Sequence, residues 1–355
     1  RLQSMQRHLV LWLFGFATAW ARFSDVHGGD TGHHGSVLRS LPSSHYLVSK
    51  NLGGFTRTFS DSAEQFGNAV HCVDMNNDGV VDILTNMLDP DNGSRGALLI
   101  LFRGSSGART IASHAKVTGA FTTALSDSDQ LGNGAMQGVD MNGDNIIDIV
   151  AGSFKDGDGG TTTGAVYVLF RGSTGSATIA SHIKVSSSST AGFTGTMESG
   201  GRFGTGLWAA DMNNDNVVDL VVSSPEVSSA AGNLFVLFRG SAGSTTIASH
   251  FQVSATVGGF TGHAGSSSNF GKKVAVADVN GDTFQDIVVS TKDTDKGAVY
   301  ILFRGSVGAN TIASFFKVCP KRHTAQTDRW DPPLAGLLGP STLMTYSGLL
   351  SLSVI

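Results

Sequence analysis

The sequence predicts an all-β protein, a partial or small β-propeller of four repeated blades, each with four strands over roughly 66 residues. Three observations lead to this fold class. One phrase of sequence returns four times, each repeat holds short β-rich apolar runs between turn residues, and no repeat carries a sustained apolar period of 3.6 residues. A β-solenoid is the alternative architecture, although its repeats are usually shorter.

The repeat is recognised from two phrases with a fixed order. Leu-Phe-Arg-Gly-Ser begins at Leu101, Leu169, Leu237 and Leu302, and Thr-Ile-Ala-Ser follows each copy. A Phe-Gly or Leu-Gly pair precedes each copy, at residues 66, 131, 203 and 270. The resulting repeats span about 45–114, 115–182, 183–250 and 251–318.

Within each repeat the apolar runs have the length of strands. In the last repeat they cover 274–277, 286–290, 298–303 and 315–318, and Gly, Ser, Asn and Asp separate them. A meander of four such strands buries its faces against neighbouring meanders, which is the arrangement of propeller blades.

A nine-residue acidic loop with the pattern D-x-N-x-D-x-x-x-D lies between the first two predicted strands of every repeat. Side chains at positions 1, 3, 5 and 9, with the backbone carbonyl of position 7, can direct their oxygens toward one cation. The predicted ligands are Asp74, Asn76, Asp78, Val80 and Asp82; Asp140, Asn142, Asp144, Ile146 and Asp148; Asp211, Asn213, Asp215, Val217 and Asp219; and Asp278, Asn280, Asp282, Phe284 and Asp286.

This donor set favours calcium, with up to four ions per chain. Calcium accepts six to eight oxygen ligands, magnesium requires a stricter octahedron and keeps its waters, and zinc prefers His or Cys. The alternative is a set of turns in which the carboxylates cap backbone amides. Three aspartates in one short loop repel each other unless a cation lies between them, which favours the metal.

The fourth loop is expected to be the weakest site. The sixth position of such a loop needs a left-handed backbone, which Gly79, Asn145 and Asn216 adopt readily and Thr283 does not. The loops differ from an EF-hand because strands flank them and because position 12 of the first copy is Thr85 rather than Glu.

Charge and motifs exclude several function classes. Lys and Arg number 24 against 28 Asp and Glu, and the net charge of -4 provides no basic field for nucleic acid. We find no G-x-S-x-G elbow, phosphate-binding loop or H-E-x-x-H motif, and every conspicuous pair of acids belongs to a predicted metal loop. The sequence therefore predicts no catalytic residues and no enzyme activity.

The first 21 residues have the order of a secretory signal. Arg7 and His8 precede an apolar run, and Ala19-Trp20-Ala21 resembles a cleavage site, so we expect a signal peptide at 1–21 and a flexible leader at 22–44. A buried amino-terminal helix is the alternative. The glycosylation sequon at Asn92 agrees with a secreted or cell-surface protein.

Residues 319–355 leave the repeat and are predicted to be a disordered tail. Their uncharged end, from Leu334 to Ile355, also leaves open a lipid-anchor signal, a weak membrane segment or an out-of-frame extension. The chain holds only two cysteines, Cys72 and Cys319, and whether they pair is left open.

Two further repeated positions can each be interpreted as functional or as purely structural. Arg103, Arg171, Arg239 and Arg304 either form a ring that grips an anionic ligand or belong to hairpin turns of the type Arg-Gly-Ser, and the turn is favoured. The slot filled by His45, His114, His182 and His250 holds Phe315 in the last repeat, which indicates packing rather than chemistry.

The order of these motifs resembles the FG-GAP repeat of the propellers in integrin α-subunits. The residues that carry it are Phe203-Gly204, the loop 211–219, the run 220–225, and Gly297-Ala298-Val299-Tyr300. The resemblance covers about 45–318 and implies a propeller with Ca²⁺ loops on one face and a ligand surface on other loops. Two features depart from it: the Gly-Ala-Pro element is degraded at 152–154 and 290–292, and there are four units rather than seven.

The predicted function is that of a calcium-binding extracellular module for ligand binding or adhesion. Its ligand would be an extracellular protein or a glycan, whose identity the Gly-, Ser- and Thr-rich loops do not specify. A carbohydrate-active enzyme, or an accessory domain of one, is the alternative, and a structural matrix protein is a third. Membrane anchoring through the tail has only weak support.

Overall fold

The structure is a computed structural model that describes residues 53–54, 65–88, 93–107, 110–158, 160–188, 191–227, 232–254, 257–262, 268–292, 297–306 and 310–319. The chain divides into two units, 1–318 and 319–355, and every described strand belongs to the first. The predicted signal peptide and leader, the sequon at Asn92, His45 and the tail after Cys319 lie outside the described residues. Across the described ranges, no helix is both long enough and apolar enough to span a membrane.

The protein is all-β, with four antiparallel blades of four strands, so the predicted fold class is confirmed. Each blade is a meander in which consecutive strands pair. The first contains β1 (Phe66–Val73), β2 (Asp82–Met87), β3 (Ala97–Arg103) and β4 (Ile111–Lys116), and the second β6 (Met136–Val139), β7 (Asp148–Ser153), β8 (Ala165–Arg171) and β9 (Thr178–Val185). The third contains β10 (Leu207–Ala210), β11 (Asp219–Ser224), β12 (Asn233–Arg239) and β13 (Ile247–Val253), and the fourth β14 (Val274–Ala277), β15 (Asp286–Thr291), β16 (Ala298–Phe303) and β17 (Ser314–Val318).

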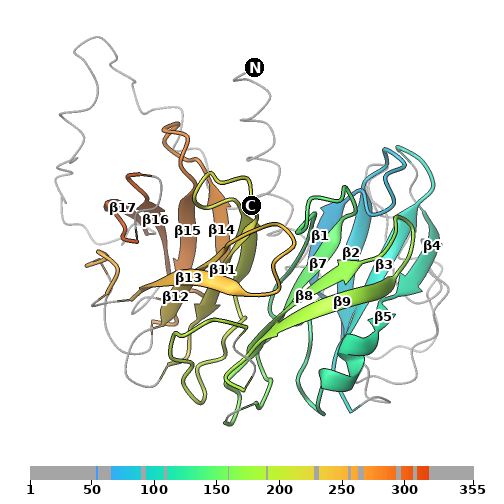
Figure 1. Ribbon diagram of the computed structural model, residues 1–355, viewed down its shortest axis with the longest axis horizontal. Helices are drawn as coiled ribbons and strands as arrows, with labels where there is room; N and C mark the ends of the chain where they lie inside the picture. Colours follow the sequence, from blue (N-terminus) through green and yellow to red (C-terminus); the bar gives the residue numbers. More distant parts are fainter. Residues whose placement is uncertain are drawn as a thin grey trace, which may run out of the picture. The chain divides into compact units, whose positions relative to one another are not determined.

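The blades follow one another around a propeller ring (Figure 1). The first strand of each blade is innermost: β1 contacts β6, β6 contacts β10, and β10 contacts β14. Within the described part of the chain, no contact of this extent joins the fourth blade to the first. We call the face that packs on the following blade the outgoing face, and the face that packs on the preceding blade the incoming face.

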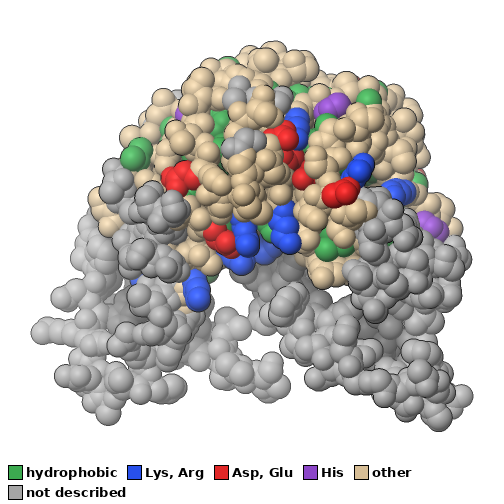
Figure 2. Space-filling view, turned by 90° about the horizontal axis from the view of Figure 1, so that it is seen from below, with side chains coloured by type: hydrophobic (Ala, Val, Ile, Leu, Met, Phe, Trp, Pro, Cys, Tyr) green, Lys and Arg blue, Asp and Glu red, His purple; other side chains and the backbone are tan. Residues whose placement is uncertain are grey.

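One end of the blades carries few charged side chains. Figure 2 shows that Lys, Arg, Asp and Glu stand there in small separate groups among uncharged polar side chains and backbone. This surface agrees with a chain in which only 15% of the residues are charged.

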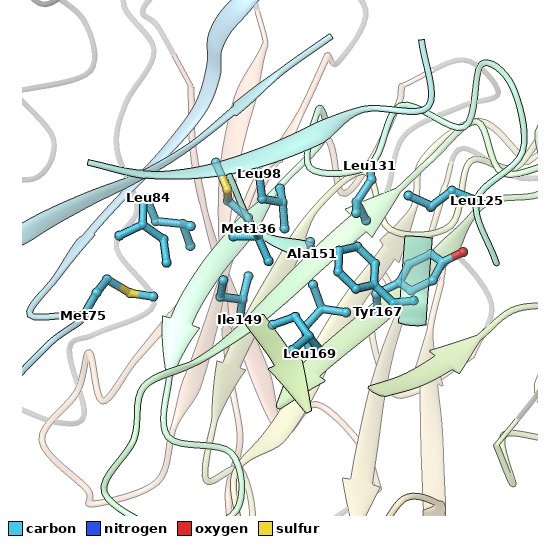
Figure 3. Close-up of a cluster of buried hydrophobic side chains, with 14 of the residues drawn as sticks. Met75, Leu84, Leu98, Leu125, Leu131, Met136, Ile149, Ala151, Tyr167 and Leu169 are labelled. Atoms are coloured by element: carbon cyan, nitrogen blue, oxygen red, sulfur yellow. The ribbon is translucent and has the colours of Figure 1, made fainter. Parts of the chain in front are cut away.

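The hydrophobic core lies between blades. Because side chains alternate across a strand, each central strand sends one set of residues to each neighbouring blade. Between the first two blades, Leu84 and Leu98 pack against Met136, Ile149 and Leu169 (Figure 3). Every residue of β8 and β12 is buried, since both faces of the second and third blades are covered.

Aromatic residues repeat at the later interfaces. Phe193 stacks on Phe203 with ring centroids 5.7 Å apart, and Phe260 stacks on Phe270 at 5.1 Å. Phe203 and Phe270 belong to the Phe-Gly pairs, which explains why that pair recurs in the sequence.

The repeated His slot is a packing position, as predicted. His182 lies 6.4 Å from Phe121 and His250 lies 4.8 Å from Phe193, measured between ring centroids. In the fourth blade Phe315 takes the same place, 5.0 Å from Phe260. Burial lowers the pKa of both His182 and His250, so these side chains remain neutral more readily than exposed histidines.

The segment that enters each blade also bonds to the outermost strand of that blade. The backbone N–H of Ile111 donates to Gly53 (2.6 Å), that of Ile247 to Ala191 (2.6 Å), and that of Ile312 to Gly258 (2.8 Å). In the second blade the short strand β5 (Thr118–Gly119) pairs in parallel with β9. In the first three blades the outermost strand thus has a backbone partner at its start, and in the fourth blade the partner bonds to Ile312, just before β17.

The arginines of the Arg-Gly-Ser hairpins join neighbouring blades. Arg171 Nη1 donates to the carbonyl of Met75 (2.8 Å) and Arg239 Nη1 to that of Met141 (2.6 Å), each in the acidic loop of the preceding blade. Arg304 makes the same bond to Met212. The hairpin position is as predicted, but these three guanidinium groups are buried and do not form a ligand-gripping ring.

Replacing Arg239 by Met is expected to lower the free energy of unfolding by about 3 kcal/mol, because four carbonyl groups lose a charged donor within a buried interface. Urea unfolding measures this change. Arg95→Met is the control, since Arg95 pairs with Asp127 on the surface and should cost less than about 1 kcal/mol. Equal losses in the two variants would contradict the inter-blade role.

Candidate functional site

The four acidic loops occupy equivalent places in the fold. They connect β1 to β2, β6 to β7, β10 to β11 and β14 to β15, as the sequence predicted. We number their residues 1 to 9, so that position 1 is Asp74, Asp140, Asp211 or Asp278. Because these loops follow the innermost strand of each blade, consecutive loops are close to each other.

The position 9 aspartates anchor the loops and are completely buried. In each, one carboxylate oxygen accepts the N–H of position 2, at 3.0, 3.0, 3.1 and 3.1 Å in the four loops. The other accepts the N–H of the hairpin arginine in the same blade, at 2.9, 2.9, 2.8 and 3.1 Å. These residues are Asp82, Asp148, Asp219 and Asp286.

Positions 1, 3 and 5 of the loops form hydrogen bonds within the loop. The position 1 carboxylate accepts the N–H of position 6, for example Asp74 from Gly79 at 2.7 Å. The position 5 carboxylate accepts the N–H of position 7 at 2.8 Å in every loop. Position 3 donates its amide to position 5, as Asn142 does to Asp144 at 3.0 Å. The predicted residues therefore do form the capped turns that were the alternative to a metal site.

These carboxylates remain suitable donors for a hard cation. No group of three or more His, Cys, Asp or Glu side chains is gathered around one point in the described ranges. Each carboxylate oxygen nevertheless has two acceptor sites, so one that accepts a single N–H can still bind an ion. Three carboxylates and one amide oxygen per loop fit the chemistry of calcium.

The sixth position of every loop has a left-handed backbone. Its φ is 82° at Gly79, 63° at Asn145, 65° at Asn216 and 76° at Thr283. The structure thus bears out the conformation that the sequence predicted. Thr283 is strained, because a β-branched side chain is disfavoured at positive φ.

The field within the loops is strongly negative. Burial raises the pKa of Asp219 to about 7 and that of Asp148 to about 6, although backbone N–H groups oppose this shift. The position 1 and position 5 aspartates raise these pKa values further by repulsion. Burial also raises the pKa of Asp82 and Asp286. A bound cation would relieve this repulsion.

Neighbouring loops touch in pairs through position 4. The Asn77 side chain donates to the carbonyl of Asn145 at 2.8 Å, and that of Asn214 to the carbonyl of Thr283 at 3.4 Å. The sequence analysis missed this contact. The only sequence signal for this contact is the alternation at position 4, where Asn77 and Asn214 in the first and third loops are replaced by Gly143 and Gly281 in the second and fourth.

A second polar cluster, also missed from the sequence, lies in the second blade. Lys184 Nζ pairs with Asp156 at 2.8 Å and with Asp158 at 2.6 Å, and the Tyr167 hydroxyl donates to Asp156 at 3.3 Å. Lys184, Asp156 and Tyr167 are nearly inaccessible, whereas Asp158 is partly exposed. The cluster brings together acids that lie outside the four acidic loops.

A repeated sequence signal accompanies this cluster. In three blades Asp-x-Asp follows the second strand, at 89–91, 156–158 and 293–295, and each of these copies precedes a lysine in the last strand of its blade, at Lys116, Lys184 and Lys317. The first and third Asp-x-Asp lie outside the described residues. Lys317 and Lys184 each stand 5.4 Å from the ring centroid of a tyrosine.

Asp129 is a buried carboxyl beside this cluster. Its side chain accepts the N–H of Ser126 at 2.7 Å. Burial raises its pKa to about 6, and the charges of Asp156 and Asp158 contribute. The folded-state pKa lies above the unfolded value of 3.8, so folding favours the protonated, neutral form of Asp129. The contribution of this group to the free energy of unfolding is therefore greatest below about pH 4 and is lost as the pH rises through about 6.

We expect Asp129→Asn to flatten this dependence and to stabilise the protein at pH 7.5 by about 2 kcal/mol relative to its effect at pH 4. The measurement is urea unfolding across pH 4 to 8 in chelator, with the wild type in parallel. Asp127→Asn, at an exposed carboxylate two residues away, is the matched control and should leave the profile unchanged. A wild-type profile after Asp129→Asn would contradict the buried, neutral carboxyl.

Comparison with protein-family models identifies the last repeat. The FG-GAP repeat model matches residues 270–302, which cover the Phe-Gly pair, the fourth acidic loop and strands β14 to β16. Residues 270–302 form an FG-GAP repeat. The resemblance predicted from the sequence is confirmed there, and the preceding three blades repeat the strand order of this FG-GAP repeat.

Two solved structures resemble the chain weakly. They are an exotype rhamnogalacturonan lyase YesX, at 13% identity and a TM-score of 0.37, and a Bacillus licheniformis rhamnogalacturonan lyase PL11, at 14% identity and 0.37. The match covers 70% of this chain in both cases, but only 48% and 50% of the lyases, so the chain spans about half their length. Nothing about activity follows at this level of similarity. Comparison with curated protein sequences gives no match.

Proposed function

We propose that this FG-GAP repeat protein is a secreted or cell-surface module that binds calcium in its acidic loops and an extracellular ligand on other loops. The observation that carries the proposal is the fourfold repetition of one loop geometry. In every loop a buried position 9 carboxylate faces two further aspartates, which leaves an uncompensated negative charge. Calcium would supply the missing positive charge.

The ions would act as structural counter-charges. The carboxylates at positions 1, 5 and 9, the amide oxygen at position 3 and the position 7 carbonyl would hold each ion, as in the loop 211–219. Because the position 9 aspartate also bonds to the hairpin of its own blade, an ion there would reinforce the junction of loop and sheet. Thr283 makes the fourth site the weakest of this set.

An extracellular location would suit calcium sites of low affinity. Extracellular calcium modules bind with Kd of about 10⁻⁴ to 10⁻³ M, which suits millimolar calcium outside cells. The signal-like segment 1–21 supports export.

The ligand would be a protein or a glycan bound on loops other than the acidic ones. The end of the blades in Figure 2 is rich in uncharged polar groups, which favours hydrogen bonding over ionic capture. We propose binding without turnover, because the polar cluster around Lys184 is internally paired and offers no group poised to react.

Calcium titration of the purified chain by calorimetry tests the metal sites. We expect about three or four ions per chain, and about 1.4 kcal/mol of stabilisation per site at ten times Kd. Asp215→Asn should remove one ion, because it takes a carboxylate from the third loop. Thr283→Asn should tighten the fourth site by relieving backbone strain.

Asp127→Asn is the matched control for this titration, since Asp127 is an exposed carboxylate outside the loops. It should leave the number of ions unchanged. If millimolar calcium neither binds nor raises the melting temperature, the carboxylates only cap their turns and the metal proposal fails.

Capture on immobilised polysaccharides and extracellular matrix proteins tests the proposed binding of an extracellular ligand. We expect saturable binding of the wild type to one of these probes, with no soluble product released. The enzyme alternative predicts product that disappears in Asp158→Asn, at the partly exposed acid of the Lys184 cluster. Product release by the wild type that is lost in this variant would replace binding with catalysis as the function.

A further inference from the structure

A short turn leads into the innermost strand of each blade, just after the Phe-Gly or Leu-Gly pair. We call these the entry turns, residues 67–69, 132–135, 204–206 and 271–273. In the later three blades a backbone N–H that donates to the residue three positions earlier marks one equivalent position, which is Asn133, Thr205 or Lys272. Asn68 holds this position in the first blade.

The entry turns adjoin one another. The Asn68 side chain donates to the Asn133 side chain at 2.7 Å, which joins the first two blades. Gly134 lies against the third entry turn, since a Cβ atom on it would be 3.0 Å from the carbonyl oxygen of Thr205. A hydroxyl group on β11 of the third blade donates to the carbonyl of Gly271 at 2.6 Å. The four turns therefore form one continuous polar surface.

The fourth entry turn differs from the others because it carries two consecutive lysines. The corresponding pairs are Asn-Ala, Asn-Gly and Thr-Gly in the first three blades, and Lys272-Lys273 in the fourth. Lys273 Nζ donates to the carbonyl of Gly134 at 3.2 Å. The side chain of Lys273 thus extends from the fourth blade to the entry turn of the second, past the blade between them.

This pair of positive charges lacks a counter-charge. Lys272 and Lys273 are both exposed, and among the described residues neither forms an ion pair with a carboxylate. The acidic loops lie at the other end of the innermost strands, since the whole of β14 separates Lys273 from Asp278. Surrounding protein removes water from Lys273 and lowers its pKa, and the charge of Lys272 lowers this pKa further.

The lysine pair also has unused hydrogen-bond donors. An ammonium group carries three N–H donors, and the bond to Gly134 uses one of those on Lys273. An anion placed between the two ammonium groups would accept charge-assisted hydrogen bonds and offset their mutual repulsion. The entry turns therefore favour a ligand with an anionic group at this point.

The neighbouring side chains are amides. Asn68 donates to Gln65 and Asn133 donates to Gln130, both at 2.9 Å, so a chain of four amide groups runs along the first two blades. Amides both donate and accept hydrogen bonds, as the hydroxyl groups of sugars do. The core of a protein–protein interface is instead apolar and rich in aromatic residues. This composition favours a glycan over a protein as the ligand.

We propose that the entry turns bind an acidic glycan, with Lys272 and Lys273 holding a carboxylate or sulfate group and the amides of the first two turns holding sugar hydroxyls. The inference rests on the ligand-binding function proposed above, and it assigns that function a place and a ligand class. One anionic anchor among many hydrogen bonds suits a surface with few charged groups.

Binding of the full chain to two matched pairs of polysaccharides tests the proposal, in calcium-containing buffer. The carboxylate pair is hyaluronate and hyaluronate whose carboxylates have been reduced to alcohols. The sulfate pair is dextran sulfate and unmodified dextran. We expect saturable binding to at least one acidic member, with a Kd at least about 10-fold lower than for its neutral counterpart.

The variants Lys272→Gln and Lys273→Gln should each raise the Kd for that acidic polysaccharide by about 10-fold. Lys116→Gln is the matched control, since it removes the same charge from an exposed side chain on the outermost strand β4 and should change the Kd by less than about 2-fold. Lys272 and Lys273 are exposed, so the melting temperatures of their variants should remain close to that of the wild type.

Equal affinity for the acidic and neutral members, or equal losses in all three variants, would overturn the acidic-glycan site and leave the general ligand-binding function intact. Capture on a matrix protein but on none of the four polysaccharides would do the same, and a loss of that capture in the two entry-turn variants would identify an acidic protein as the ligand. No capture on any polysaccharide or matrix protein would overturn both proposals.

Discussion

The pairing of a buried aspartate with a hairpin arginine is the constraint on which the rest of the fold depends. Asp148 accepts the backbone N–H of Arg171 and that of Met141, which fixes the acidic loop to its own sheet. The guanidinium of Arg171 then extends to the carbonyl of Met75 in the preceding loop. A carboxylate without these N–H donors would be costly to bury, and a guanidinium without carbonyl acceptors equally so. The aspartate finds its donors within its own repeat, and the arginine finds an acceptor in the preceding repeat.

Stability in such an array is close to a sum of blade and interface contributions. The second and third blades are covered on both faces, so the opening of either blade disrupts two apolar cores at once. The two end blades have fewer covered residues and should open first under denaturant, as local unfolding begins where the least apolar area is buried. Binding at the acidic loops would therefore stabilise the junctions between blades more than their outer edges.

Much of the fold could be predicted from the sequence because the strand-length apolar runs and turn residues recur in the same order in all four repeats. The four strands of the last blade lie within a residue of their predicted ends, and Thr283 adopts the left-handed backbone expected for its loop position. Arg239 was assigned to a hairpin turn, but its backbone ends strand β12 just before that turn, and burial of its guanidinium depends on a carbonyl almost one hundred residues earlier. The cluster of Asp156 and Lys184 also joins separate segments, and no local pattern specifies such pairing.

The segment that enters each blade has a consequence for solubility. An outermost strand normally presents a row of free N–H and C=O groups, and such an edge can recruit strands from other chains into aggregates. Here the carbonyl of Ala191 accepts the N–H of Ile247, and the two residues of β5 pair with Thr178 and Ile179, so the chain itself covers the start of these edges. Shortening this connection would uncover the start of these strands, and the protein would then be expected to aggregate through them more readily.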